Sequence, residues 1–215
     1  MKKGITKILS ACVFAFVVFL AAGTQSKAAV NMGVKQTGAG SSYVDLAWNA
    51  QLGAGHYHTQ FSQDGKNWID MEYSSSPSDS VYNLTQGASY YARVVAYNGS
   101  HYSGTHVMVG VSETAIVSTK PTEVTGLTQT AAGVNSVSMS WNASAGAASY
   151  VIYGYINYNW TQIGTSATNS ATITGVAATT STKFSVAAVK NVTGGTVTGD
   201  QCSGVEMKAI PIKVS

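Results

Sequence analysis

Hydrophobic and polar residues alternate with a period of two along most of the chain. Val44, Leu46 and Trp48 alternate with polar or smaller residues, and similar alternation runs through residues 90–97 and 137–141. Successive side chains of a strand point to opposite faces of the sheet, so this period predicts strands that bury one face. Glycine-containing turn sequences interrupt the runs. Since no later segment shows the period of an amphipathic helix, the pattern predicts an all-β protein.

The first 28 residues follow a different pattern. Lysines at positions 2, 3 and 7 precede an almost wholly apolar run over residues 8–23, and Ser26 and Ala28 supply the small residues that a signal peptidase requires. The run is shorter than the ~20 residues that span a bilayer. Residues 9–12 match a lipoprotein box by their letters, but the apolar run continues past Cys12. We therefore expect residues 1–28 to be a cleaved signal peptide, with no membrane insertion afterwards and an extracellular mature protein that is either secreted or associated with the cell surface.

The remaining chain contains an internal repeat. The segment VDLAWNA at residues 44–50 recurs 93 residues later as VSMSWNA, and Trp68 and Trp160 are 92 residues apart. One nearly constant offset therefore spans a unit of about 90 residues, the size of a single β-sandwich. A short connection containing Pro121 separates the copies. The repeat predicts two domains, at residues 29–117 and 118–215.

Each copy has a Trp that ends one strand and a Tyr that opens the next, and the first copy has the run Leu-x-x-Gly-x-x-Tyr that begins at Leu84. In these residues each copy resembles a fibronectin type III domain, as found in bacterial secreted proteins. This resemblance implies two immunoglobulin-like β-sandwiches in tandem, with a tyrosine corner at Tyr90 and Thr182 in the corresponding place of the second copy. The core residues that it implies are Trp48, Tyr57, Leu84, Tyr90, Trp141 and Tyr150.

Charge and motifs exclude several functions. The chain has 12 Lys and Arg against 9 Asp and Glu, but four of the lysines precede Ala29, so the mature chain carries −1. A chain with this net charge has no overall electrostatic attraction to the phosphates of a nucleic acid, so nucleic-acid binding is not predicted. No nucleophile elbow, metalloprotease, phosphate-loop or dinucleotide motif occurs. Asp70 and Glu72 are interpreted as solvated surface carboxylates, so neither enzymatic activity nor a cofactor is predicted.

Candidate binding residues are aromatic or histidine side chains. His56 and His58 share a strand face and should point outward if Tyr57 points inward. A metal would need a third ligand from His101 or His106, which the spacing does not place, so no metal site is predicted. The candidate surface consists of His56, His58, Tyr91, Arg93, Tyr97 and Tyr102 in the first copy and Tyr153, Tyr155 and Tyr158 in the second.

These features predict a non-catalytic interaction, adhesion or spacer protein that binds an extracellular protein or glycan. The alternative is a carbohydrate-binding accessory module associated with extracellular glycan degradation, since the family often occurs in bacterial hydrolases. A small hydrolase is the third class and lacks a motif. Cys202 is the one cysteine of the mature chain. It is interpreted as a buried residue of a monomer, with an intermolecular disulfide as the alternative.

Overall fold

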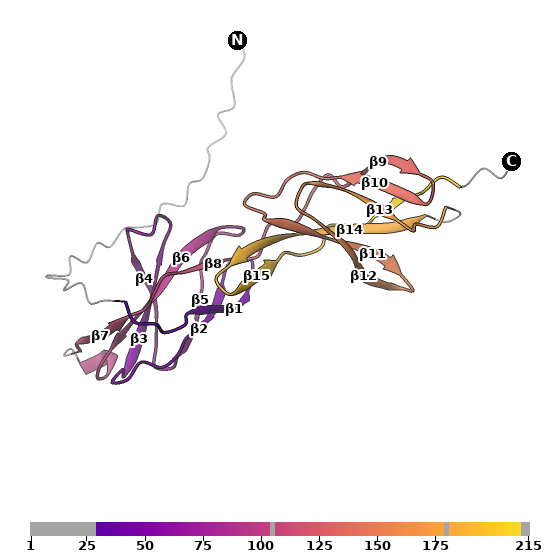
Figure 1. Ribbon diagram of the computed structural model, residues 1–215. Coiled ribbons are helices and arrows are strands. Elements are labelled where there is room, and N and C mark those ends of the chain that lie inside the picture. The colour runs from indigo at the N-terminus through magenta and orange to yellow at the C-terminus, as the bar shows by residue number, and fades with distance from the viewer. Residues whose placement is uncertain (1–28, 104–105, 179–180, 212–215) are drawn as a thin grey trace, which may run out of the picture.

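The computed structural model describes residues 29–103, 106–178 and 181–211, which form two β-sandwiches placed end to end (Figure 1). The predicted signal peptide lies outside the described residues. All regular elements of the described part are strands apart from the 3₁₀ helix η1 (His101–Ser103). The predicted all-β, two-sandwich fold is thereby confirmed. In the same part of the chain, no helix has the length and apolar character needed to cross a membrane.

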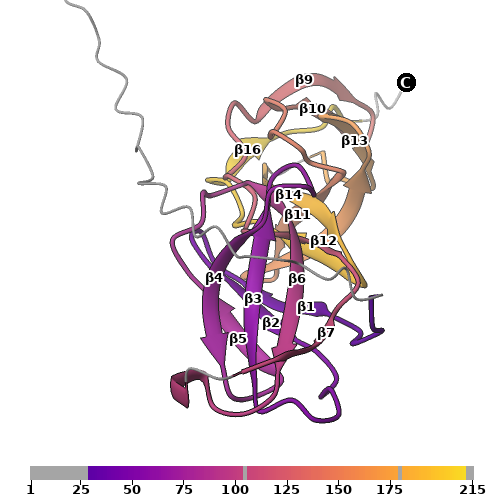
Figure 2. The same cartoon turned by 90° about the vertical axis from the view of Figure 1, so that its left-hand side faces the viewer.

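The first domain packs a three-stranded sheet against a larger one, with every pairing within the sheets antiparallel. The smaller sheet has the order β1 (Lys35–Ala39), β2 (Val44–Ala47), β5 (Ser78–Val81). The larger has the order β4 (Ile69–Ser74), β3 (His56–Ser62), β6 (Ser89–Tyr97), β7 (Met108–Val111), and β8 (Ala115–Ser118) also pairs with β6. Figure 2 shows β3 lying between β4 and β6.

The second domain repeats this arrangement strand for strand. Its smaller sheet has the order β13 (Ser170–Thr174), β10 (Ser136–Ser140), β9 (Thr128–Gly133). Its larger sheet has the order β12 (Asn159–Ser166), β11 (Ser149–Ile156), β14 (Thr182–Val192), β15 (Gly195–Thr198), and β16 (Val205–Met207) also pairs with β14. The sequence repeat therefore corresponds to a repeat of the topology.

The two cores are built around the same aromatic pair. Trp48 meets Tyr57 edge to face with ring centroids 5.3 Å apart, and Trp141 meets Tyr150 in the same way at 5.3 Å. Such an arrangement places the positive edge of one ring against the negative face of the other. The residues implied as core by the resemblance are all buried, namely Trp48, Tyr57, Leu84, Tyr90, Trp141 and Tyr150.

The first domain has a tyrosine hydrogen bond that the second domain lacks the side chain to form. The Tyr90 hydroxyl accepts a hydrogen bond from the Thr85 amide at 3.0 Å, which closes the tyrosine corner at the start of β6. Thr182 stands at the corresponding position at the start of β14. A threonine has no phenol ring with which to reach a preceding turn, so this corner is specific to the first domain.

Polar contacts join the two domains. The Ile116 amide donates to Thr193 Oγ1 at 2.7 Å, and the Thr193 amide donates to the Ile116 carbonyl at 2.8 Å. Lys190 is buried and its ammonium donates to the carbonyl of Gly87. These contacts connect the β14–β15 turn and the end of β14 to the first domain. The junction is therefore held by more than the covalent link through Pro121.

Cys202 is buried in the core of the second domain. Its sulfur accepts a hydrogen bond from the Val186 amide at 3.2 Å, and Ser185 lies 3.7 Å away through its hydroxyl. An intermolecular disulfide would require this region to open.

Candidate functional site

The histidines of the first domain gather on the outer face of its larger sheet. His56 and His58 are alternate residues of β3, and His56 lies opposite Tyr97 of β6. Beyond β6 the chain comes close to the residue that precedes β3. A Cβ atom on Gly55 would stand only 2.1 Å from the Gly99 carbonyl oxygen. This close approach requires glycine at position 55 and brings η1, with His101, over the face that His56 occupies.

Burial of His56 differs from the prediction of an exposed imidazole. Its side chain leaves β3 on the expected face, opposite to Tyr57, yet only 1% of its surface is exposed. The reason is tertiary, since His101 lies edge to face with His56 at 5.5 Å and His106 at 5.1 Å. His56 is therefore part of a covered cluster and is unavailable for direct stacking on a ligand.

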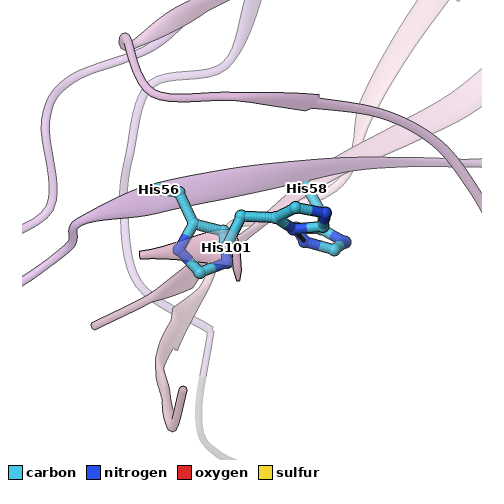
Figure 3. Close-up of side chains that lie close together, drawn as sticks. All are labelled: His56, His58 and His101. Carbon is cyan, nitrogen blue, oxygen red and sulfur yellow. Dashed lines mark hydrogen bonds between the residues drawn. The ribbon is translucent and has the colours of Figure 1, made fainter. Parts of the chain in front are cut away.

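Three imidazoles of this cluster bring ring nitrogens close together (Figure 3). His58 Nε2 and His101 Nδ1 are 3.2 Å apart, and one ligand atom from each of His56, His58 and His101 lies within 4.8 Å of the other two. His56 Nδ1 lies 3.1 Å from the Gly99 carbonyl oxygen. His58 Nδ1 lies 4.0 Å from an Asp70 carboxylate oxygen. This arrangement has the composition of a transition-metal site.

Aromatic rings enclose the cluster. Tyr97 stacks on His56 with centroids 5.3 Å apart, and Tyr73 stacks on His101 at 4.2 Å. Burial lowers the pKa of His58 below its ordinary value, an effect that the carboxylate of Asp70 partly opposes. The imidazole of His58 therefore favours the neutral form. Tyr73 was absent from the predicted surface, because only the pairing of β4 with β3 brings it next to the histidines.

The predicted continuous aromatic face of the first domain is divided in two. Tyr91 and Tyr97 share a face of β6 but are six residues apart, roughly 20 Å along a strand. Between them, Arg93 lies over the ring of Trp68, 4.1 Å from its centroid, and donates to Gln60 Oε1 at 2.7 Å. Arg93 is thus engaged within the domain. Tyr91 forms one exposed end, while Tyr102 is exposed beside the histidine cluster.

The candidate aromatics of the second domain lie on the hairpin formed by β11 and β12. Tyr155 and Trp160 pair across the strands with centroids 5.3 Å apart, and both are exposed. Asn157 and Tyr158 form its two-residue turn with φ of 50° and 64°. That backbone suits asparagine and is unusual for a bulky residue, and it leaves Tyr158 90% exposed. Tyr153 is half-buried, so the exposed patch consists of Tyr155, Tyr158 and Trp160.

The strand order and the repeated core define the class of the protein as two immunoglobulin-like β-sandwiches in tandem, the fold that the resemblance to fibronectin type III domains implies. No protein-family profile matches the chain. The chain is 33% identical over 162 residues to "Chitinase A1" of Niallia circulans, a match that covers 72% of this chain. It spans 22% of the length of that curated relative.

Two of the solved structures that the chain matches are segments of several fibronectin type III domains. One is a two-domain segment from chicken tenascin, with a TM-score of 0.41 and 16% identity, covering 81% of this chain and 97% of that one. Another comprises the FN1–FN3 domains of chicken CNTN1, with a TM-score of 0.47 and 14% identity, covering 85% of this chain and 68% of that one.

Proposed function

We propose that the protein is an exported, non-catalytic spacer and interaction module that acts outside the cell, as a monomer, on an extracellular protein or glycan. The observation that carries this proposal is the junction between the two domains. Two independent domains joined by a flexible linker would move freely relative to each other. Here the reciprocal pair of Ile116 and Thr193 and the buried Lys190 resist such motion.

Charge complementarity supports the same proposal. The backbone of Lys120 is hydrogen-bonded to Gly40 and Gly87 of the first domain, and its ammonium lies 2.7 Å from a carboxylate oxygen of Asp200 in the second domain. An exposed ion pair of this kind contributes at most about 1 kcal/mol by itself. Together with the hydrogen bonds it defines one preferred orientation, which is what a spacer needs in order to hold two attachments at a set distance.

The distance between the far ends of the domains tests the spacer function. Leu52, between β2 and β3 of the first domain, and Tyr158, between β11 and β12 of the second, are both highly exposed. Spin labels at these two positions, in a Cys202→Ser background, should give a single narrow distance distribution by pulsed electron resonance. A broad distribution spanning tens of ångströms would contradict the proposal.

Glycan binding is a second candidate function, favoured by the exposed patch of Tyr155, Tyr158 and Trp160. Aromatic faces pack against the apolar faces of sugar rings, and contiguous exposed apolar patches often mark ligand-binding sites. The similarity to a protein named as a chitinase adds support. On this reading the pair of domains would be an accessory unit that brings the protein to a glycan.

Sedimentation with insoluble chitin, together with a glycan array, tests this second function. We expect binding to be lost when Tyr158 or Trp160 is replaced by alanine. Tyr82→Ala is the matched control, because Tyr82 is also exposed, at 51%, but lies in the other domain. No retention on any glycan, or equal retention of all three variants, would remove this candidate and leave the spacer function to be judged by the distance measurement.

A further inference from the structure

The histidine cluster of the first domain has a geometry that its role in the fold does not require. Two ligands bound to one Zn²⁺ at about 2.05 Å in a tetrahedral arrangement stand about 3.3 Å apart. His58 Nε2 and His101 Nδ1 are already 3.2 Å apart. His56 completes a group of three whose nitrogens lie within 4.8 Å of one another. His101 lies on the short helix η1, so this third imidazole comes from the connection after β6 and not from β3.

The hydrogen bonds around His56 set its tautomer. A carbonyl oxygen only accepts, so the 3.1 Å contact with Gly99 places a proton on Nδ1 and leaves a lone pair on Nε2. Within the described part of the chain, that Nε2 is buried and has no hydrogen-bond partner. The side chain is 1% exposed, so water does not readily compensate for the missing bond. A cation bound at Nε2 would satisfy this atom.

A similar outer contact orients His58. Its Nδ1 faces the Asp70 carboxylate at 4.0 Å while its Nε2 points to His101. Metal-bound histidines usually direct their second ring nitrogen to a carboxylate or a backbone carbonyl, which orients the ring and makes it a better ligand. His56 has such a contact with the Gly99 carbonyl at 3.1 Å, and the Asp70 carboxylate lies within ion-pair distance of His58.

Aromatic rings also hold two of the imidazoles in place. Tyr97 stacks on His56, and Tyr73 stacks on His101. Coordination uses the lone pair of an imidazole nitrogen. The donor set of three nitrogens and no thiolate suits Zn²⁺ among the transition metals that imidazole binds.

We propose that His56, His58 and His101 form a Zn²⁺ site that joins β3 to the connection between β6 and β7. The three imidazoles leave one coordination position for a non-protein ligand. The ion would stabilise the first domain, because anything that binds only the folded state raises its stability. This site is independent of the spacer and glycan functions, which use the junction and the second domain.

Zinc titration tests the site directly. The chain beginning at Ala29, produced without a polyhistidine tag and stripped with chelator, is titrated with ZnCl₂ near pH 7.5 by calorimetry. We expect one equivalent to bind and the unfolding midpoint of the first domain to rise. His58→Ala and His101→Ala should each weaken the affinity at least about tenfold, a loss typical of disturbed metal sites. Tyr82→Ala, which alters an exposed ring that packs on Tyr43 rather than on the histidines, should retain wild-type affinity.

A spectroscopic measurement covers His56, whose replacement in the core endangers folding. Long-range ¹⁵N–¹H spectra of the wild-type protein should show the His56 Nε2 resonance move on addition of Zn²⁺ while its Nδ1 stays protonated. Failure to saturate at one equivalent would overturn the proposal. So would binding that survives both His58→Ala and His101→Ala in variants with wild-type circular dichroism.

Discussion

Ile116 and Thr193 form a reciprocal pair of hydrogen bonds across the domain boundary, at 2.7 and 2.8 Å. Ile116 belongs to β8. One edge of β8 pairs with β6, and the opposite edge faces Thr193. Thr193 lies in the turn between β14 and β15. The turn of the second domain therefore covers part of a free strand edge of the first, and this protects backbone groups that would otherwise be available to another chain.

Removal of the Thr193 hydroxyl should loosen the junction. Thr193→Val keeps the side-chain shape and deletes the acceptor for the Ile116 amide, at a net cost of about 0.5–1.5 kcal/mol. We expect ¹⁵N relaxation to show the two domains of the variant tumbling more independently than in the wild type. Thr161→Val, on the exposed part of β12, is the control and should leave the relaxation unchanged. Unaltered tumbling of the Thr193 variant would show that the junction does not depend on this pair.

Removing the hydroxyl of the equivalent core tyrosine, Tyr57 or Tyr150, should destabilise each domain by a similar amount. Tyr57 Oη accepts from the Gln51 amide at 3.1 Å, and Tyr150 Oη accepts from the Ser144 amide at 3.0 Å. Tyr57→Phe and Tyr150→Phe should each lower the free energy of unfolding of their own domain by about 1 kcal/mol. Urea unfolding followed by tryptophan fluorescence measures this. A cost confined to one of the two variants would refute the equivalence.

The tyrosine corner should stabilise only the first domain. Tyr90→Phe removes the acceptor for the Thr85 amide, and we expect a loss of about 1 kcal/mol in the free energy of unfolding of that domain. The transition of the second domain should not move. Tyr82→Phe, on an exposed ring, serves as the control. An equally small effect of both changes would mean that water replaces the corner bond.

Asp79 should make stability fall as the pH rises. Burial raises its pKa above the ordinary value of 3.8, although Thr59 and the Ser80 amide donate to it. The folded state then holds this proton at a pH where the unfolded state has released it, so stability is lost as the pH rises through the native pKa. Asp79→Asn should abolish this contribution and gain most relative to the wild type near pH 7. The measurement is the free energy of unfolding between pH 3 and pH 7.

Asp64 should change the free energy of unfolding with pH in the direction opposite to Asp79. Hydrogen bonds from the amides of Asn67 and Lys66 lower the pKa of this exposed carboxyl. Its contribution is present above the unfolded pKa and is lost as the pH falls. Asp64→Asn should therefore cost most near pH 7 and least near pH 3. If Asp79→Asn followed that same trend, the burial effect assigned to Asp79 would be incorrect.

Cys202 should react slowly in the folded protein. The thiol is 7% exposed and lies in the core of the second domain. In the chain beginning at Ala29, we expect a thiol reagent to label it at least about tenfold faster in concentrated urea than in buffer, because labelling requires opening of the domain. Fast labelling of the native protein, or a dimer that disappears on reduction, would contradict its burial.

The sequence by itself determined the strands, the two-domain repeat and the aromatic core. Each of these depends on local spacing. A period of two decides which side chains enter the core, and an offset of 93 residues places Trp141 and Tyr150 where Trp48 and Tyr57 stand in the first domain.

The tertiary structure decided which surface residues meet. His56 is buried, Tyr73 stacks on His101, and Arg93 turns to Trp68 because connections between strands fold over a sheet face, and no local period describes that folding. The pairing of Ile116 with Thr193 likewise depends on how one domain rests on the other. Strand periodicity indicates only which side chains face the core and which face solvent. A functional site also depends on the distances between residues that are far apart in the chain.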